Sequence, residues 1–287
     1  MSAKVAPQGG DTCMRRVTLL KMEGSEYMQI DGITTVTFFK GQLPRDAIKK
    51  RFFDIIKANP WIAGRLEKCD AGADKGKVQI VFDTKKIPDG QEFDDSYLKD
   101  LFFEVEVADF SSSTPFEQIN EKIKNDANLK KAHIAESGWT LLKKKLPFTK
   151  LTVVRSANAN DTWALIFSVS HTIADGYTYY RLLNMLSLSK DSNESVRPLK
   201  PERKHDFPSK VEDAVGKQEW ATVMGGGGLI CNYISNMVFG KKPITRAFYV
   251  DLDEIKKLKG DLLGNDSGEI DLSAESTFQN FCDISLN

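Results

Sequence analysis

His171 and Asp175 are the residues of this chain whose types and spacing best fit proton-transfer chemistry. Residues 163–169 are typical of a buried β-strand and residues 177–186 of a helix, so a short turn carries both side chains. An imidazole with a pKa near neutrality can take a proton from a hydroxyl or an amine and later return it. The carboxylate is close enough to hold the turn, and Gly176 can adopt backbone angles that other residues resist. The pattern therefore predicts a general base, His171, on a rigid turn.

Charge balance and cysteine usage exclude several other functions. Lys and Arg together number 40, as do Asp and Glu, which gives no net charge and no global attraction for nucleic acid. The four cysteines and three histidines show no spacing typical of a metal site. The absence of a secretory signal predicts reduced thiols and a cytoplasmic protein. No apolar run reaches the length of a transmembrane segment.

The turn must be positioned by an alternation of strands and helices. Runs rich in β-branched and aromatic residues predict strands at 32–39, 61–66, 77–82, 102–107, 148–155 and 162–169. A helix is expected from Leu43 to Asn59, with Pro44 in its first turn and Pro60 as its end. Local hairpins mixed with helices favour an α/β sandwich with a mixed sheet over a doubly wound nucleotide-binding fold. The four consecutive glycines 225–228 lack the spacing of a phosphate loop and predict a hinge.

Three segments together resemble a known family. Residues 60–66 match Pro-x-x-Ala-Gly-Arg-Leu, residues 171–176 match His-x-x-x-Asp-Gly, and residues 246–254 begin with Arg-x-Phe before an acidic helix start. In this order they resemble the chloramphenicol-acetyltransferase-like superfamily, and most closely its BAHD-type CoA-dependent acyltransferases, over residues 15–265. The resemblance implies a chloramphenicol-acetyltransferase-like two-layer sandwich, in which helices flank a mixed β-sheet.

The resemblance divides the sequence into four parts. Residues 1–14 are expected to be a disordered tail, and residues 15–189 the N-terminal acyltransferase domain that carries the motif. Residues 190–244 are expected to form a linker, and residues 245–287 the start of a second domain with a strand at 246–250. The family's C-terminal half, with its Asp-Phe-Gly-Trp-Gly motif, is missing from this sequence, so the fold is expected to be incomplete.

The resemblance also implies a reaction and a role for each motif residue. His171 would deprotonate a small-molecule alcohol or amine, which attacks the thioester of an acyl-CoA co-substrate, with no permanent cofactor and no metal. The two substrates would reach His171 through a tunnel from opposite sides. In the family the aspartate is structural and pairs with an arginine; Arg65 is the first candidate partner of Asp175, and Arg246 the second. Ser170 replaces the first of two adjacent histidines found in peptide-synthetase condensation domains, which favours simple O- or N-acyl transfer.

A hypothesis from another class stays open. The chain can instead be a catalytically inactive remnant of the same fold that serves as a binding or interaction module. Activity can also require a partner that supplies the missing half. Thiol release from acyl-CoA, abolished by His171→Ala, distinguishes an enzyme from an inactive remnant.

Overall fold

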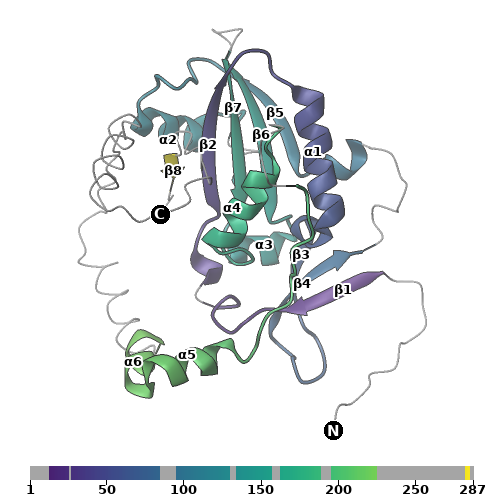
Figure 1. The fold of residues 1–287 in the computed structure, drawn as a ribbon, viewed down its shortest axis with the longest axis vertical. Coiled ribbons are helices and arrows are strands. Elements are labelled where there is room, and N and C mark those ends of the chain that lie inside the picture. The colour runs from purple at the N-terminus through teal and green to yellow at the C-terminus, as the bar shows by residue number, and fades with distance from the viewer. Residues whose placement is uncertain are drawn as a thin grey trace, which may run out of the picture. The chain divides into compact units, whose positions relative to one another are not determined.

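A computed structural model describes residues 13–25, 27–84, 95–129, 134–156, 162–188, 195–224 and 282–284. The chain divides into two compact units: residues 1–202 with 278–287 form the first, and residues 203–277 the second. The first unit contains both sheets and the predicted site (Figure 1). Within the described residues, no helix is long and apolar enough to cross a membrane.

A five-stranded mixed sheet forms the centre of the first unit. Its strands lie in the order β5-β6-β7-β2-β8; β5 and β6 run parallel, and the other neighbours antiparallel. Their bounds are β2 Ile33–Lys40, β5 Phe102–Val107, β6 Thr149–Ser156, β7 Thr162–Val169 and β8 Cys282–Ile284. An antiparallel sheet of order β1-β4-β3 contains β1 Met14–Thr18, β4 Val78–Asp83 and β3 Arg65–Lys68. The predicted α/β class with a mixed sheet is confirmed.

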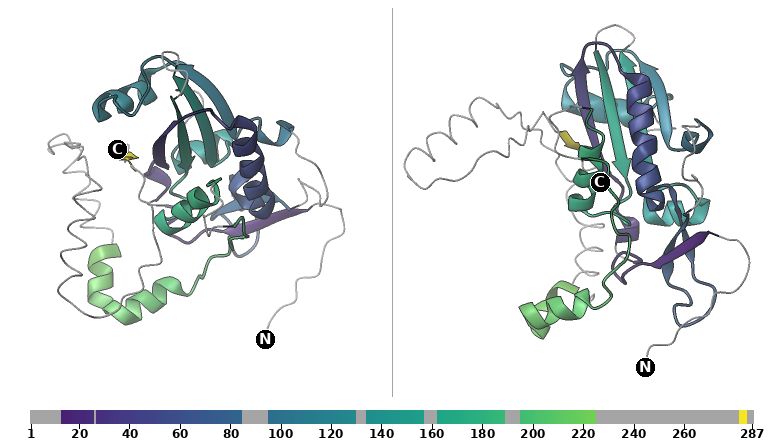
Figure 2. Two further views of the ribbon diagram at one scale, coloured as in Figure 1. Left: turned by 45° about the horizontal axis from the view of Figure 1, so that its top comes forward. Right: turned by 45° about the vertical axis from the view of Figure 1, so that its right-hand side comes forward.

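Helices cover both faces of the five-stranded sheet. α1 (Arg45–Ala58) and α4 (Gly176–Met185) share one hydrophobic core with strand residues such as Val153 and Phe167. Because successive strand residues point to opposite faces, Val154 and Ile166 are buried on the other side, where α2 (Phe116–Asn125) lies (Figure 2). The remaining helices are α3 (Gly138–Lys144), α5 (Phe207–Val215), α6 (Lys217–Met224) and the 3₁₀ helices η1 (Tyr27–Gln29), η2 (Pro60–Ala63) and η3 (Asp95–Leu98).

The expected strand at 61–66 is only partly correct, because η2 separates α1 from β3. The cause is the buried side chain of Asn59, which follows the last residue of α1. Its amide nitrogen donates to the carbonyl oxygens of Ile55 at 3.1 Å and Arg197 at 3.0 Å. Its amide oxygen accepts a hydrogen bond from the backbone nitrogen of Leu199 at 2.6 Å. Asn59 is thus hydrogen-bonded to a segment far away in the sequence, and the strand begins only at Arg65.

Other segments also depart from the sequence-based expectations or lie beyond what the structure describes. β1 was not predicted and begins at Met14, within the expected tail. α5 and α6 occupy part of the expected linker, 190–244. The glycines 225–228 and the expected strand at 246–250 lie outside the described residues. The hairpins β3–β4 and β6–β7 form as predicted.

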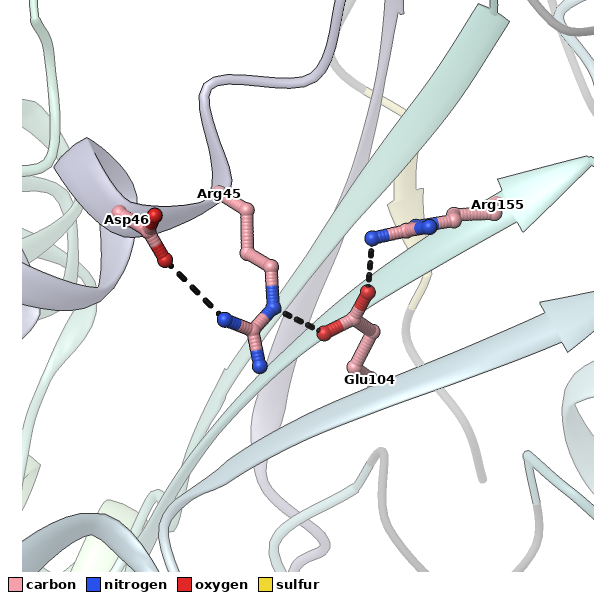
Figure 3. Close-up of polar contacts among 4 residues, drawn as sticks. All are labelled: Arg45, Asp46, Glu104 and Arg155. Atoms are coloured by element: carbon pink, nitrogen blue, oxygen red, sulfur yellow. Dashed lines mark hydrogen bonds and ion pairs between the residues drawn. The ribbon is translucent and has the colours of Figure 1, made fainter. Parts of the chain in front are cut away.

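A carboxylate on β5 ties the start of α1 to the sheet (Figure 3). Glu104 accepts a hydrogen bond from Arg45, the first residue of α1, and forms an ion pair with Arg155 on β6. Arg45 also contacts Asp46, with 3.0 Å between Nη1 and Oδ1. The hydrogen bond to Glu104 is the main reason why the pKa of Arg45 is raised above its ordinary value. One side chain therefore links α1, β5 and β6 at the edge of the sheet.

Removing the charge of Glu104 tests how much its contacts with Arg45 and Arg155 stabilise the fold. Glu104→Gln is expected to lower the free energy of unfolding by about 0.5–1 kcal/mol, because the network is largely exposed. The loss is expected to shrink in 1 M salt, where surface charges are screened. Urea unfolding at low and high salt measures both effects. Glu106→Gln on the same strand is the control, since Glu106 is exposed and forms no ion pair among the described contacts; equal losses in both variants contradict the link.

Candidate active site

β7 brings His171 to the end of the central sheet. The strand lies between β6 and β2, and its residues from Trp163 to Val169 are all buried. The backbone nitrogen of Ser170 donates to the carbonyl oxygen of Phe148 at 2.8 Å, which extends the pairing one residue past the strand. The nitrogens of Ile173 and Ala174 then donate to the carbonyl oxygen of Ser170 at 3.2 and 3.3 Å. The chain reverses tightly, with His171 at the start of the turn.

Tyr179 fixes α4, which follows the turn, to the two central strands. Its side chain is fully buried. The hydroxyl group of Tyr179 lies 2.9 Å from the carbonyl oxygen of Phe167 on β7 and 2.8 Å from the hydroxyl oxygen of Thr35 on β2. Because a buried hydroxyl group without partners would be costly, these bonds specify one position for the helix. The turn is therefore held at both of its ends.

Asp175 is the N-cap residue of α4. Its carboxylate accepts a hydrogen bond from the backbone nitrogen of Thr178 at 2.8 Å, which satisfies one of the free amide groups at the start of the helix. The first candidate arginine, Arg65, forms an ion pair with Glu67 at 2.7 Å, and the second, Arg246, lies outside the described residues. Asp175 is exposed, and within the described residues it forms no ion pair. It acts on the turn through capping.

Gly176 does not need the conformational freedom expected of it. It is not among the glycines with a positive φ angle. An added Cβ atom at this position would meet no other heavy atom within 4 Å. The expected backbone role is therefore wrong, and the residue instead leaves open space at the first turn of α4.

The two ring nitrogens of His171 differ in their surroundings. The residue is half-buried. Its Nδ1 atom is buried and has no hydrogen-bond partner among the described residues, whereas Nε2 is not among the buried unpartnered atoms. Asp175 does not bond to the ring, because its carboxylate caps α4. The arrangement can therefore exchange a proton through Nε2, and it contains no hydrogen-bonded aspartate–histidine pair.

Two segments that the sequence analysis did not connect to the site pack against the turn. The ring of Tyr27, in η1, lies 5.3 Å from the ring of His171 at an interplanar angle of 71°. The hydroxyl group of Thr172 donates to the carbonyl oxygen of Tyr27 at 3.1 Å. A Cβ atom on Gly138, at the start of α3, would collide with the hydroxyl oxygen of Thr172 and come within 2.6 Å of the sulfur of Met28. Only a glycine allows η1, α3 and the turn to meet so closely.

A shallow cavity elsewhere in the first unit is not the tunnel that the family resemblance implies. No residue of the His171 turn lines it. Its walls come from α1, η2, η3 and the end of β4, and the lining residues are Ile56, Lys57, Pro60, Ala63, Asp83, Thr84 and Tyr97. In the described part of the chain, no cluster of His, Cys, Asp and Glu side chains could hold a metal ion.

Charged groups near the segment that joins η1 to β2 have shifted pKa values. The pKa of Asp31 is raised above 3.8, first by partial burial of the carboxyl group and second by the negative charge of Glu136. The pKa of Lys150 is lowered, chiefly by burial. The neighbouring Gly32 donates its backbone N–H to the carbonyl oxygen of Ala135 at 3.2 Å. The segment beside the site thus carries a carboxylate whose ionised form is disfavoured.

Capping and ion pairing predict different results for Asp175 variants. Asp175→Ala is expected to lower the free energy of unfolding by about 1 kcal/mol, because a backbone amide loses its acceptor. Asp175→Asn is expected to lose less than half as much, since asparagine caps helices nearly as well as aspartate. Urea unfolding measures both. If the asparagine variant is as unstable as the alanine variant, the carboxylate charge matters rather than the cap.

The raised pKa of Asp31 predicts a pH-dependent change in stability. Since the folded chain binds this proton more tightly than the unfolded chain, the contribution of Asp31 to stability is lost as the pH rises through the folded pKa. Asp31→Asn is therefore expected to stabilise the protein at pH 7, and the gain should vanish below the unperturbed value of 3.8. Thermal unfolding from pH 3 to 7 tests this, with Asp100→Asn, another exposed aspartate, as the control. A gain that persists in acid contradicts the assignment.

No protein-family model and no curated protein matches this sequence. The fold is similar to solved structures of low sequence identity. F. graminearum TRI101 complexed with ethyl coenzyme A is 10% identical with a TM-score of 0.40, and the match covers 60% of this chain and 38% of that chain. The starter condensation domain of rhizomide synthetase RzmA is 10% identical (TM-score 0.39), with coverages of 60% and 36%. The condensation domain from Monacolin K polyketide synthase MokA is 12% identical (TM-score 0.39), with coverages of 81% and 45%. The chain thus matches less than half the length of each of these structures.

Proposed function

We propose that His171 is the general base of an acyl-CoA-dependent acyltransferase. The observation that carries the proposal is a half-buried imidazole, of which Nδ1 is the buried nitrogen, on a turn fixed at both ends. The His-x-x-x-Asp-Gly spacing of residues 171–176 supports the choice of reaction. Because Asp175 caps α4 and does not bond to the ring, His171 acts alone in proton transfer.

In the proposed reaction, the neutral imidazole accepts the proton of an acceptor hydroxyl or amine on Nε2. The acceptor oxygen or nitrogen forms a bond to the thioester carbonyl carbon, and the carbon–sulfur bond breaks as the tetrahedral intermediate collapses. His171 returns the proton to the leaving thiolate, which departs as free coenzyme A. No covalent bond to the protein forms, and atoms and charge balance without a metal or an additional cofactor.

The rest of the site would keep this base in place. Tyr179 fixes α4 to β7 and β2, and Asp175 caps the first turn of that helix. The open space beside Gly176 leaves room for a substrate at the start of α4. Since a base displaced by about 1 Å can lose about 100-fold in rate, this rigid support is a requirement of the mechanism.

The proposal predicts that His171→Ala abolishes acyl transfer. The rate of thioester loss from a panel of acyl-CoAs with alcohols and amines is expected to fall at least about 100-fold, the usual contribution of a general base. Thioester absorbance should be followed as well as free thiol, because the chain contains four cysteines. His205→Ala is the matched control, since His205 is an exposed histidine of the second unit.

Two outcomes contradict the proposal. One is full activity in His171→Ala, which would place the chemistry elsewhere. The other is no turnover and no coenzyme A binding by the wild-type chain with any donor tested. The second result supports the inactive binding module instead. Partial recovery of the His171→Ala rate by added imidazole would strengthen the assignment of a base.

A further inference from the structure

Among the described residues, Nδ1 of His171 has no hydrogen-bond partner that would define the orientation of the ring. A catalytic histidine usually donates one ring N–H to a carbonyl or carboxylate oxygen, which sets both its tautomer and its rotation. Here Nδ1 is buried without a partner among the described residues, and Asp175 is engaged with Thr178. The ring must therefore be oriented by packing, and among the described residues it makes an aromatic contact with Tyr27.

Tyr27 is itself held firmly on the turn. Its backbone nitrogen donates to the carbonyl oxygen of Met22 at 3.1 Å, and its carbonyl oxygen accepts from the hydroxyl group of Thr172 at 3.1 Å. The next residue, Met28, is fully buried. Because Gly138 lies very close to both Met28 and Thr172, α3 packs tightly against this junction. Tyr27 thus has a fixed place beside the residue that follows His171.

We propose that Tyr27 is a positioning residue that fixes the place and the plane of the His171 imidazole. The ring centroids are 5.3 Å apart at 71°, a T-shaped arrangement in the range that aromatic pairs prefer. Rotation about the Cα–Cβ bond, or tilting of the ring out of its plane, would break this contact. The inference rests on the proposed function of His171, and it assigns to Tyr27 orientation of the base without contact to the reacting atoms.

The proposal assigns the effect to the ring of Tyr27 and not to its hydroxyl group. Tyr27→Phe keeps the ring, so its kcat is expected to stay within about 3-fold of wild type. Tyr27→Leu keeps much of the apolar volume and loses the ring, so its kcat is expected to fall about 10- to 100-fold, the scale of a misplaced catalytic group. KM is expected to change little, because the base and not the substrate is displaced.

Tyr97→Leu provides a matched control for general destabilisation. Tyr97 is also half-buried and also makes an aromatic contact, at 6.1 Å from the ring of Phe53, away from the turn. Thermal unfolding should show comparable losses for Tyr27→Leu and Tyr97→Leu. Only Tyr27→Leu should lower kcat. If Tyr27 had only a structural role, Tyr27→Leu and Tyr97→Leu would have the same kcat.

A measurement made without substrate tests the role of Tyr27 separately from the proposed function of His171. The ring ¹⁵N and ¹H chemical shifts of His171 report its tautomer and its distance from the Tyr27 ring, whether or not the chain is active. They are expected to change in Tyr27→Leu and to stay unchanged in Tyr27→Phe and Tyr97→Leu.

Specific results would overturn the role of Tyr27. Unchanged His171 shifts in Tyr27→Leu would show that the ring is not held by this contact. Wild-type kcat in Tyr27→Leu, or an equal loss of kcat in Tyr27→Phe, would also contradict it. If His171→Ala is fully active while the shifts respond as expected, the proposed function fails and the packing role stands.

Discussion

The hydrogen bonds of the Tyr179 hydroxyl group are the constraint on which the site depends. They connect α4 to β7 and β2 inside the core, where no water can substitute for either partner. The turn between β7 and α4 is short, so fixing the helix leaves the loop few conformations. Asp175 then caps the first turn of α4. These bonds and the helix cap together set the location of His171.

Local patterns predicted the elements that carry the site. β2 has an uninterrupted β-branched and aromatic run, β7 is apolar at most positions, and α1 ends before Asn59 as Pro60 requires. Predictions were wrong where a long-range contact decided the outcome. Asn59 bonds to the backbone at Arg197 and Leu199, far away in the sequence, and η2 forms where a strand was expected. Periodicity carries no information about such contacts.

In the candidate site, too, local features could be predicted from the sequence and long-range contacts could not. Spacing alone suggested His171 and Asp175 as site residues, and the cap that Asp175 forms on α4 is a local contact of the kind that spacing can indicate. The role of Tyr27 could not be predicted, since it lies 144 residues before His171 and no motif connects them. In sequence, Gly138 resembles many other glycines. Only the short distances from a Cβ atom added at Gly138 to its neighbours reveal the tight junction. The arginine partner was predicted from the family resemblance, whereas the helix itself provides Asp175 with a donor.

Exposed apolar side chains on three elements around the turn bear on how the base could be shielded from water. Ile30 follows η1, Trp139 belongs to α3 and Tyr177 to α4, and they are 40%, 45% and 70% exposed. Acyl transfer to an acceptor other than water requires that water be kept from the thioester. A bound surface that buried these side chains and also kept water from His171 would gain hydrophobic stabilisation of about 25 cal/mol per Å² of apolar area. Water exclusion and binding would then be driven by the same contacts, which is how an exposed base can become a selective one.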